Sequence, residues 1–181
     1  MDASFAVKIN CMAIIKTLRG KTPVFGKNCF IAENAVVVGE VRMGDNCTVW
    51  FNAVVRGDVH SITIGDNTNI QDGAIIHCTY QRAKTVIGSN VSIAHNAIVH
   101  GCTVEDNVLI GMGAIVMDDA LIGRESIIAA GAIVLAGTQV EPGSIYAGTP
   151  ARKVKDIGPE MREVISRTAR NYPMYAEWYK Q

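Results

Sequence analysis

Large apolar residues recur at every sixth position along most of this 181-residue chain. Four positions after all but one of them stands a small or β-branched residue; the exception is Tyr80, which follows Ile76 beside an insertion. Gly-Asp-Asn, Gly-Ser-Asn and similar tripeptides lie between the steps. These tripeptides supply the positive φ angles and side-chain hydrogen bonds that tight turns require. The nineteen large positions are Phe25, Ile31, Val37, Met43, Val49, Val55, Ile64, Ile70, Ile76, Ile87, Ile93, Val99, Val104, Ile110, Val116, Ile122, Ile128, Val134 and Val140.

A six-residue hydrophobic period is typical of β-solenoids, in which each coil completes its core against the next coil. One large and one small residue per step would point inward, and the turn residues would point outward. At three sides per coil, nineteen steps make about six coils. The strict period from Ile110 to Val140, with Ile-Gly and Ile-Ala at the corners, resembles the left-handed hexapeptide β-helix family. We therefore expect an all-β fold, a single-stranded left-handed parallel β-helix with a C-terminal α-helix.

The chain divides into three predicted segments: an N-terminal extension at 1–11, the β-helix at 12–147, and a helical segment at 148–181 that packs on the solenoid. The stretch from Tyr146 to Arg152 is interpreted as an exit turn. Helical spacing follows at Met161, Val164, Ile165, Thr168 and Tyr172, and Gly158-Pro159 is a suitable start. We expect Pro173 to end or kink this helix. A second short helix would then carry the aromatic cluster of Tyr175, Trp178 and Tyr179 against the solenoid.

Composition agrees with a β fold, because 21 Ile and 20 Val stand against only 4 Leu. The charges balance at 17 basic and 17 acidic residues, so we expect neither nucleic acid nor an anionic membrane surface as a partner. No apolar stretch is long enough to span a membrane and the N-terminus has no secretory pattern, which predicts a cytoplasmic protein. The cysteines form no CxxC pair and are interpreted as small buried thiols; they are Cys11, Cys29, Cys47, Cys78 and Cys102.

The six-residue step breaks at three places, and polar residues of unusual type gather there. Val55 to Ile64 is three residues too long, Ile76 to Ile87 is five too long, and Val99 to Val104 is one too short. The first break carries Arg56-Gly-Asp58 and His60, the second follows His77, and the third follows His100. The four histidines of the chain all lie between positions 60 and 100, which favours a metal site over isolated structural histidines.

The register of the coils converts these positions into a geometry. Val55, Ile76 and Val99 occupy one corner on successive coils, so Arg56, His77 and His100 should form a column. Coils about 4.8 Å apart allow two stacked imidazoles to reach one ion at roughly 2.0 to 2.1 Å. His95 follows Ile93 on the neighbouring corner, some 15 Å away by strand length. It could join the other two only from another subunit, which predicts a homotrimer with metals at its interfaces.

Three imidazoles with an open fourth position are typical of a hydrolytic or hydrating Zn²⁺ site, although Fe²⁺ or Co²⁺ also suit these ligands. Gln71 and Asn69 flank Ile70, which shares the corner of Ile93, so both amides should enter the site beside His95. An amide there could orient the attacking nucleophile. Arg56, Asp58 and Asp72 offer an arginine–carboxylate network across the interface, for which a structural role is favoured.

Four segments of the chain resemble the motifs of the gamma-class carbonic anhydrase family of left-handed β-helix trimers. They are Asn52-Ala-Val-Val-Arg56-Gly-Asp58, Asn69-Ile-Gln71-Asp72, Ile76-His77 and His95-Asn-Ala-Ile-Val-His100-Gly-Cys102, and the likeness extends over about residues 12 to 180. The resemblance implies that His77 and His100 of one subunit and His95 of the next hold zinc. It implies that Gln71 and Asn69 contact the hydroxide or substrate, and that Arg56, Asp58 and Asp72 lock the interface. The implied reaction is the reversible hydration of CO2 to bicarbonate.

The chain departs from the prototype of that family at two acidic positions linked to proton transfer. Val59 stands where the prototype has a glutamate after Arg-Gly-Asp, and the loop at 78–85 contains no acid. Each hydration must export a proton, so this loss argues against rapid turnover. His60 could act as a substitute proton carrier, since histidine side chains in general suit this role, but an exposed loop histidine without that role is the favoured interpretation.

Two functions of other classes compete with CO2 hydration. Many proteins of similar fold are acyl-CoA-dependent hexapeptide acyltransferases that use one histidine as a base. Three histidines with ligand geometry argue against that activity here, because none stands alone beside a long substrate loop. A non-catalytic metal-bound scaffold or carrier is the third possibility, supported by the missing acidic loop and the aromatic C-terminal tail.

Overall fold

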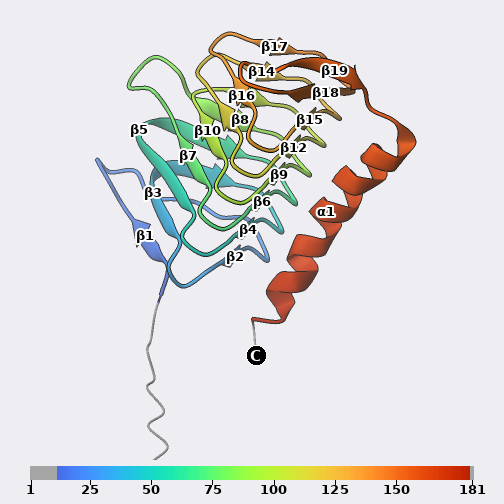
Figure 1. The fold of residues 1–181 in the computed structure, drawn as a ribbon. Coiled ribbons are helices and arrows are strands. Elements are labelled where there is room, and N and C mark those ends of the chain that lie inside the picture. Colours follow the sequence, from blue (N-terminus) through green and yellow to red (C-terminus); the bar gives the residue numbers. More distant parts are fainter. Residues whose placement is uncertain (1–11, 180–181) are drawn as a thin grey trace, which may run out of the picture.

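The computed structural model describes residues 12–179, which form a stack of about seven triangular turns with one helix along its side (Figure 1). The expected extension at 1–11 lies outside the described residues. The strands are β1 (Ile14–Lys16), β2 (Phe30–Ile31), β3 (Val36–Met43), β4 (Thr48–Val49), β5 (Val54–Ile64), β6 (Asn69–Ile70), β7 (Ile75–His77), β8 (Thr85–Ile87), β9 (Ser92–Ile93) and β10 (Ile98–His100). They continue with β11 (Thr103–Val104), β12 (Leu109–Ile110), β13 (Ile115–Val116), β14 (Leu121–Ile122), β15 (Ile127–Ile128), β16 (Ile133–Val134), β17 (Gln139–Val140), β18 (Ser144–Ala147) and β19 (Arg152–Asp156).

The strands make three faces, and within each face neighbouring strands are parallel. The first face holds β1, β3, β5, β7, β10, β13 and β16, and the second holds the ends of β3 and β5 followed by β8, β11, β14 and β17. The third face holds β2, β4, β6, β9, β12, β15 and β18, with β19 antiparallel at its edge. β3 and β5 bend around a corner and therefore belong to two faces. This is the left-handed hexapeptide β-helix that the sequence predicts.

The interior follows the predicted alternation of large and small side chains. Of the nineteen large positions, all are buried except Phe25 and Ile31, which pack against the core from the first turns. Most of the partners four residues later are buried as well, among them Ala53, Ala74 and Ala97, whereas Tyr80 beside the insertion is exposed. A single coil cannot bury these side chains, so the core forms only where coils stack.

The turns carry the left-handed backbone that the Gly-Asp-Asn tripeptides predict. Asn46 and Asn67 have φ angles of 57° and 54°, and the Asn46 side chain donates to the Asn67 side chain at 3.1 Å. Gly44 beside them has no room for a Cβ, which would collide with Asp66 of the next coil. The tripeptides thus serve both the turn and the close stacking of coils.

The solenoid has about seven turns instead of about six, because it extends at both ends: β1 pairs with β3 before the first counted step, and β18 pairs with β15 after the last. Tyr146 continues the six-residue step beyond Val140, is only 8% exposed, and lies in β18, which pairs in parallel with β15. The interpretation of this stretch as an exit turn is therefore wrong at its start. An aromatic residue can take the inward position because it lies in the last turn, where no further coil stacks on it.

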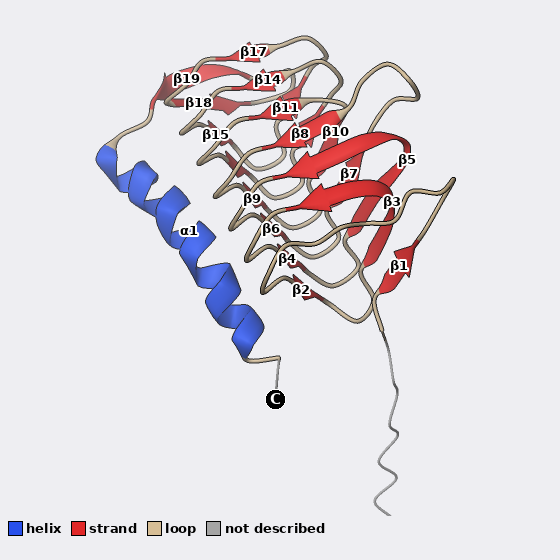
Figure 2. Ribbon diagram, turned by 180° about the vertical axis from the view of Figure 1, so that it is seen from behind, coloured by secondary structure: helices blue, strands red, loops and turns tan. Residues whose placement is uncertain are grey.

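The helix α1 (Pro159–Glu177) begins after Gly158, as expected, and runs along the third face from the last turns back to the first (Figures 1 and 2). Ile165 packs with Ile127 and Ile157 near the start of the helix. Near its end, the rings of Tyr172 and Tyr179 lie 5.4 and 5.6 Å from that of Trp50. Of the predicted aromatic cluster, Tyr179 packs on the solenoid, whereas Trp178 is 62% exposed and stacks on Tyr175. No helix within residues 12–179 is long and apolar enough to cross a membrane.

The prediction that the helix ends at Pro173 is wrong, because α1 continues through this residue to Glu177. Proline removes one backbone hydrogen bond and crowds the preceding turn. Aromatic contacts of Tyr172 and Tyr179 with Trp50, before and after Pro173, hold this end of the helix on the solenoid. Tertiary packing therefore outweighs the local preference, and no second short helix forms at residues 174–177.

The cysteines within the described residues are free thiols. Cys47, Cys78 and Cys102 are buried and Cys29 is half-buried, which agrees with their interpretation as small interior residues. Cys11 lies outside the described part of the chain.

Candidate metal centre

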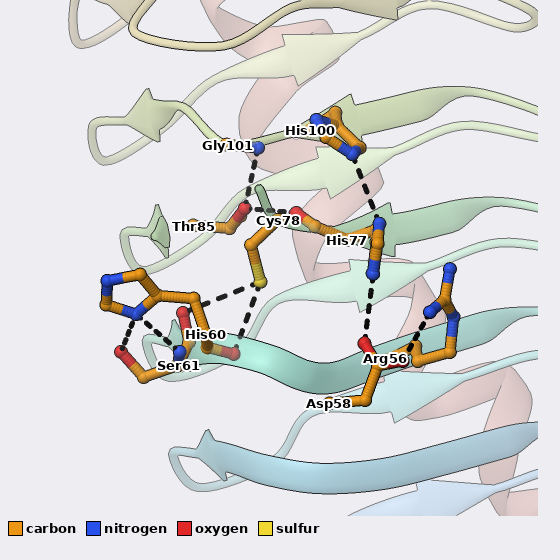
Figure 3. A network of polar contacts seen from close by, with 9 residues as sticks. All are labelled: Arg56, Asp58, His60, Ser61, His77, Cys78, Thr85, His100 and Gly101. Carbon is orange, nitrogen blue, oxygen red and sulfur yellow. Dashed lines mark hydrogen bonds and ion pairs between the residues drawn. The ribbon is translucent and has the colours of Figure 1, made fainter. Parts of the chain in front are cut away.

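His77 and His100 face each other at one corner of the solenoid. His77 ends β7 and His100 ends β10, and the register pairs Ile76 with Val99 and His77 with His100. The inward residues Ile76 and Val99 are fully buried, so the next residue of each strand points outward. The Nδ1 atom of His77 lies 3.1 Å from the Nε2 atom of His100 (Figure 3). Two ring nitrogens from consecutive coils are thus directed at the same point.

A carboxylate and an arginine support His77 from the coil below. Asp58 contacts the Nε2 atom of His77 at 3.0 Å, and Arg56 donates to the other oxygen of Asp58 at 2.5 Å. Burial raises the pKa of Asp58, but the bonds from Arg56 and His77 outweigh it, so the pKa lies below its ordinary value. Burial also lowers the pKa of His77, despite the opposing effect of Asp58. His77 is therefore neutral at pH 7, the form that binds metals.

A second carboxylate, which the sequence analysis did not single out, supports His100 from the coil above. The Oδ1 atom of Asp118 lies 2.5 Å from the Nδ1 atom of His100, and Thr79 donates to Oδ2 at 2.5 Å. Burial raises the pKa of Asp118, but these two bonds bring it below its ordinary value. The six-residue step offers a signal for Asp118. Val116 follows Val99 on the next coil of the same corner, and Asp118 lies two residues after Val116.

His95 lies on a different corner, after β9 of the third face, as its spacing predicts. Its Nδ1 atom contacts Asp72 at 3.0 Å, and both side chains are about two-fifths exposed. Within residues 12–179 no three His, Cys, Asp or Glu side chains lie close enough together to hold one ion. A single chain thus offers two histidines at one corner and the third elsewhere.

Gln71 and Asn69 are both buried, but only Gln71 lines the cavity that His95 also lines. Gln71 and His95 both line an apolar cavity of about 370 Å³ between the third face and α1. Asn69 is fully buried, where it accepts a bond from the Gln71 amide at 3.0 Å and donates to Ser92 at 2.8 Å. The Gln71 side chain therefore reaches the cavity. Asn69 does not line the cavity and instead holds the amide group of Gln71.

Arg56, Asp58 and Asp72 do not form one network within the chain. Arg56 and Asp58 pair with each other beside His77, and Asp72 pairs with His95 on the neighbouring corner. The network expected across an interface remains a prediction, because it joins residues of different subunits. In the single chain, each of the two aspartates supports a histidine.

His60 is not the exposed loop residue that the sequence predicts. It lies within β5 and is half-buried, because β5 extends through the insertion. Its Nδ1 atom accepts a hydrogen bond from the Ser61 amide at 2.8 Å, and its ring lies apart from the pair of His77 and His100 (Figure 3). The insertion lengthens a strand instead of forming a loop.

Comparisons with known proteins give the same fold and similar sequences. A family model described as bacterial transferase hexapeptide (six repeats) matches residues 22–57 and 101–136. A Methanocaldococcus jannaschii protein named "Probable carbonic anhydrase" is 44% identical over 154 residues, which cover 85% of this chain and 96% of that protein. A crystal structure of a hexapeptide transferase family protein from Anaplasma phagocytophilum is similar with a TM-score of 0.88 and 37% identity, over 92% of this chain and 98% of that one.

A longer plant protein is also similar. "Gamma carbonic anhydrase 1, mitochondrial" from Arabidopsis thaliana is 38% identical over 162 residues, which cover 87% of this chain. The match covers 59% of the plant protein, so this chain spans less than two thirds of that relative's length.

Proposed function

Since this chain belongs to the gamma carbonic anhydrase-like family of hexapeptide-repeat proteins, we propose that it is a homotrimeric zinc protein that hydrates CO2 reversibly to bicarbonate. One observation carries the proposal: His77, His95 and His100 each use one ring nitrogen to contact an aspartate. This arrangement leaves the second nitrogen of each ring for a metal ion. Carboxylate partners of this kind fix the orientation of metal-binding histidines and strengthen them as ligands.

The donor set fits a zinc ion. Two nitrogens that bind one tetrahedral zinc at roughly 2.0 to 2.1 Å are about 3.3 Å apart, and His77 and His100 place theirs at 3.1 Å. The lowered pKa of His77 keeps its ring neutral. Imidazole ligands also accept Fe²⁺ or Co²⁺, so the proposal of zinc rests on the family and on the reaction.

A homotrimer would bring His95 of one subunit to His77 and His100 of the next. An apolar column on the first face supports such an interface, since its members point outward next to the histidine corner. Ile75 is 39% exposed, and the rest of the column is partly exposed; it consists of Val36, Val54, Ile98, Ile115 and Ile133. Exposed apolar columns of this length mark protein interfaces. A corner that meets the adjacent corner of a neighbour closes as a threefold ring.

The residues around the site have distinct roles in the proposed reaction. When bound, the metal supplies Lewis acidity that brings the pKa of a water molecule to about 7. Gln71 would present its carbonyl oxygen to the reacting centre, since its amide nitrogen is held by Asn69. Ala94, Met112 and Ile128 line the cavity beside His95 and suit an apolar molecule such as CO2. Arg56 holds Asp58, which orients His77.

We expect the release of the proton to limit the rate of CO2 hydration. Position 59 is a valine, and the loop at 78–85 has no acidic residue that could carry the proton away. The His60 ring lies apart from the paired histidines (Figure 3). Buffer would then have to accept the proton directly from the site. We expect slow hydration whose rate rises with buffer concentration.

A stopped-flow assay with a pH indicator tests the function. Protein purified anaerobically and loaded with zinc or with iron(II) should hydrate CO2 faster than buffer alone, and His77→Ala should not. The absence of any rate above buffer for both metals would overturn the enzymatic proposal. Metal retained without a rate would instead favour a non-catalytic scaffold or carrier.

An acyltransferase is the second candidate, because a hexapeptide transferase family protein has a closely similar structure. Isothermal titration with acetyl-CoA separates the two functions. We expect no heat of binding from the intact trimer. Saturable binding that persists in His77→Ala would favour acyl transfer, since it would not depend on the metal ligands.

A further inference from the structure

We propose that Asp118 is a positioning residue for His100 and that Thr79 holds Asp118 in this role. The inference rests on the metal site of the proposed function. Asp118 and Thr79 lie outside the segments that resemble the gamma-class motifs, and neither contacts the reacting centre in the arrangement proposed above. Their contribution is to determine which nitrogen of His100 faces His77.

Both oxygens of the Asp118 carboxylate are engaged. Oδ1 lies 2.5 Å from the Nδ1 atom of His100, and Oδ2 accepts a hydrogen bond from the Thr79 hydroxyl at 2.5 Å. The Asp118 side chain is only 16% exposed, so water competes little for these bonds. The carboxylate is therefore fixed between two partners.

The contact determines the tautomer of His100. An ionised carboxylate only accepts hydrogen bonds, so the Nδ1 atom of His100 must carry the hydrogen. The Nε2 atom of the neutral ring then carries the free electron pair, and this is the atom that lies 3.1 Å from His77. Asp118 thus turns the metal-binding nitrogen of His100 towards the shared point.

The three residues come from three successive coils, which makes the arrangement a property of the stacking. Thr79 follows β7, His100 ends β10, and Asp118 follows β13. Gly101 gives the carboxylate its room, because a Cβ at this position would collide with Asp118. The neighbouring Asp119 makes a different contact, an exposed ion pair with Arg82 at 2.9 Å. Asp119 is therefore a matched control for the loss of a carboxylate.

Zinc affinity of the full-length trimer, measured by competition with a chromogenic chelator, tests the role. Asp118→Asn should weaken zinc binding by about 10- to 100-fold, the usual effect of losing such a partner. Thr79→Val should weaken it less, and Asp119→Asn should leave it unchanged. The visible absorption of the Co²⁺-substituted protein should change in Asp118→Asn and not in Asp119→Asn, because it reports the ligand geometry. Asp118→Glu should recover part of the affinity.

His100→Ala separates failure of this inference from failure of the metal site. If His100→Ala binds zinc like the unmodified protein, the proposed site itself is wrong. If His100→Ala loses zinc while Asp118→Asn keeps the original affinity and cobalt spectrum, the positioning role alone is overturned. Should Asp118→Asn fail to fold, Thr79→Val decides, since unchanged zinc affinity and an unchanged cobalt spectrum in that variant would also overturn the role.

Discussion

The Nδ1 atom of His77 and the Nε2 atom of His100 lie 3.1 Å apart on consecutive coils of one chain. Each ring is held by its own aspartate, Asp58 from the coil below and Asp118 from the coil above. His95, with Asp72, lies on the neighbouring corner, apart from this pair. In the proposed trimer, the paired histidines of one chain and His95 of the next would complete one site.

Mixing His77→Ala chains with His95→Ala chains should restore metal sites that neither variant forms alone. In a mixed trimer, an interface can combine the intact His77 and His100 of one chain with the intact His95 of another. Random reassembly of equal amounts should restore about a quarter of the zinc content. An interface has all three histidines only when the His95→Ala chain supplies His77 and the His77→Ala chain supplies His95, and each of these has a chance of about one half. Elemental analysis of the reassembled trimers measures it.

His60→Ala is the control for this experiment, and it should retain full zinc content because His60 lies apart from the pair. Mixed trimers that form normally but contain no more zinc than the separate variants would show that the three histidines do not meet across an interface.

Ile98→Glu should dissociate the trimer while leaving the coils folded. Ile98 points outward in the apolar column of the first face, and a buried unpaired carboxylate at an interface is costly. Val86→Glu is the matched control, because Val86 points outward from the second face. Sedimentation should give a monomer mass for Ile98→Glu and a trimer mass for Val86→Glu. Equal masses for the two variants would contradict an interface on the first face.

Cys29 should react with iodoacetamide with a half-maximal rate near pH 7. A hydrogen bond with Cys47 lowers the pKa of the Cys29 thiol to about 7, while the same contact raises the pKa of Cys47. The thiolate is the reactive form, so alkylation is slow below this pH and fast above it. Mass spectrometry of the Cys29 peptide follows the rate.

Two comparisons check the cause of this reactivity. Cys47→Ala should return the Cys29 pKa towards roughly 8.5 and slow alkylation at pH 7 about tenfold. Burial raises the pKa of Cys78 to about 11 and that of Cys102 to about 12, so both should stay unmodified. A midpoint above pH 8 for Cys29 in the unaltered protein would refute the effect of Cys47.

Pro173→Ala should raise the free energy of unfolding by about 1 to 3 kcal/mol, because alanine restores a backbone hydrogen bond in the continuous helix. Thermal unfolding should show a midpoint higher by roughly 2 to 4 °C per kcal/mol. Met174→Ala alters a half-exposed neighbour in the same turn and should change the stability little. An unchanged or lower midpoint for Pro173→Ala would mean that the solenoid requires proline at this place.

The six-residue period by itself determined the coil, the inward residues and the register. Ile76 pairs with Val99, and Ile70 pairs with Ile93, as counting by threes predicts. The period is enough to predict these features because every coil repeats the same local geometry. Once one residue of a six-residue step is known to point inward, the side-chain directions of the other five follow. The register also placed His77 and His100 in one column and His95 on another corner.

Only the tertiary structure decided which polar groups support those histidines. Asp118 reaches His100 because coil stacking and the space above Gly101 bring the two together, and Asp72 turns to His95 instead of to Arg56. The continuous helix through Pro173 likewise depends on contacts with Trp50. The physical reason is that side-chain contacts between coils depend on rotamers and on insertions such as 79–83, whereas the period encodes only which way each residue points.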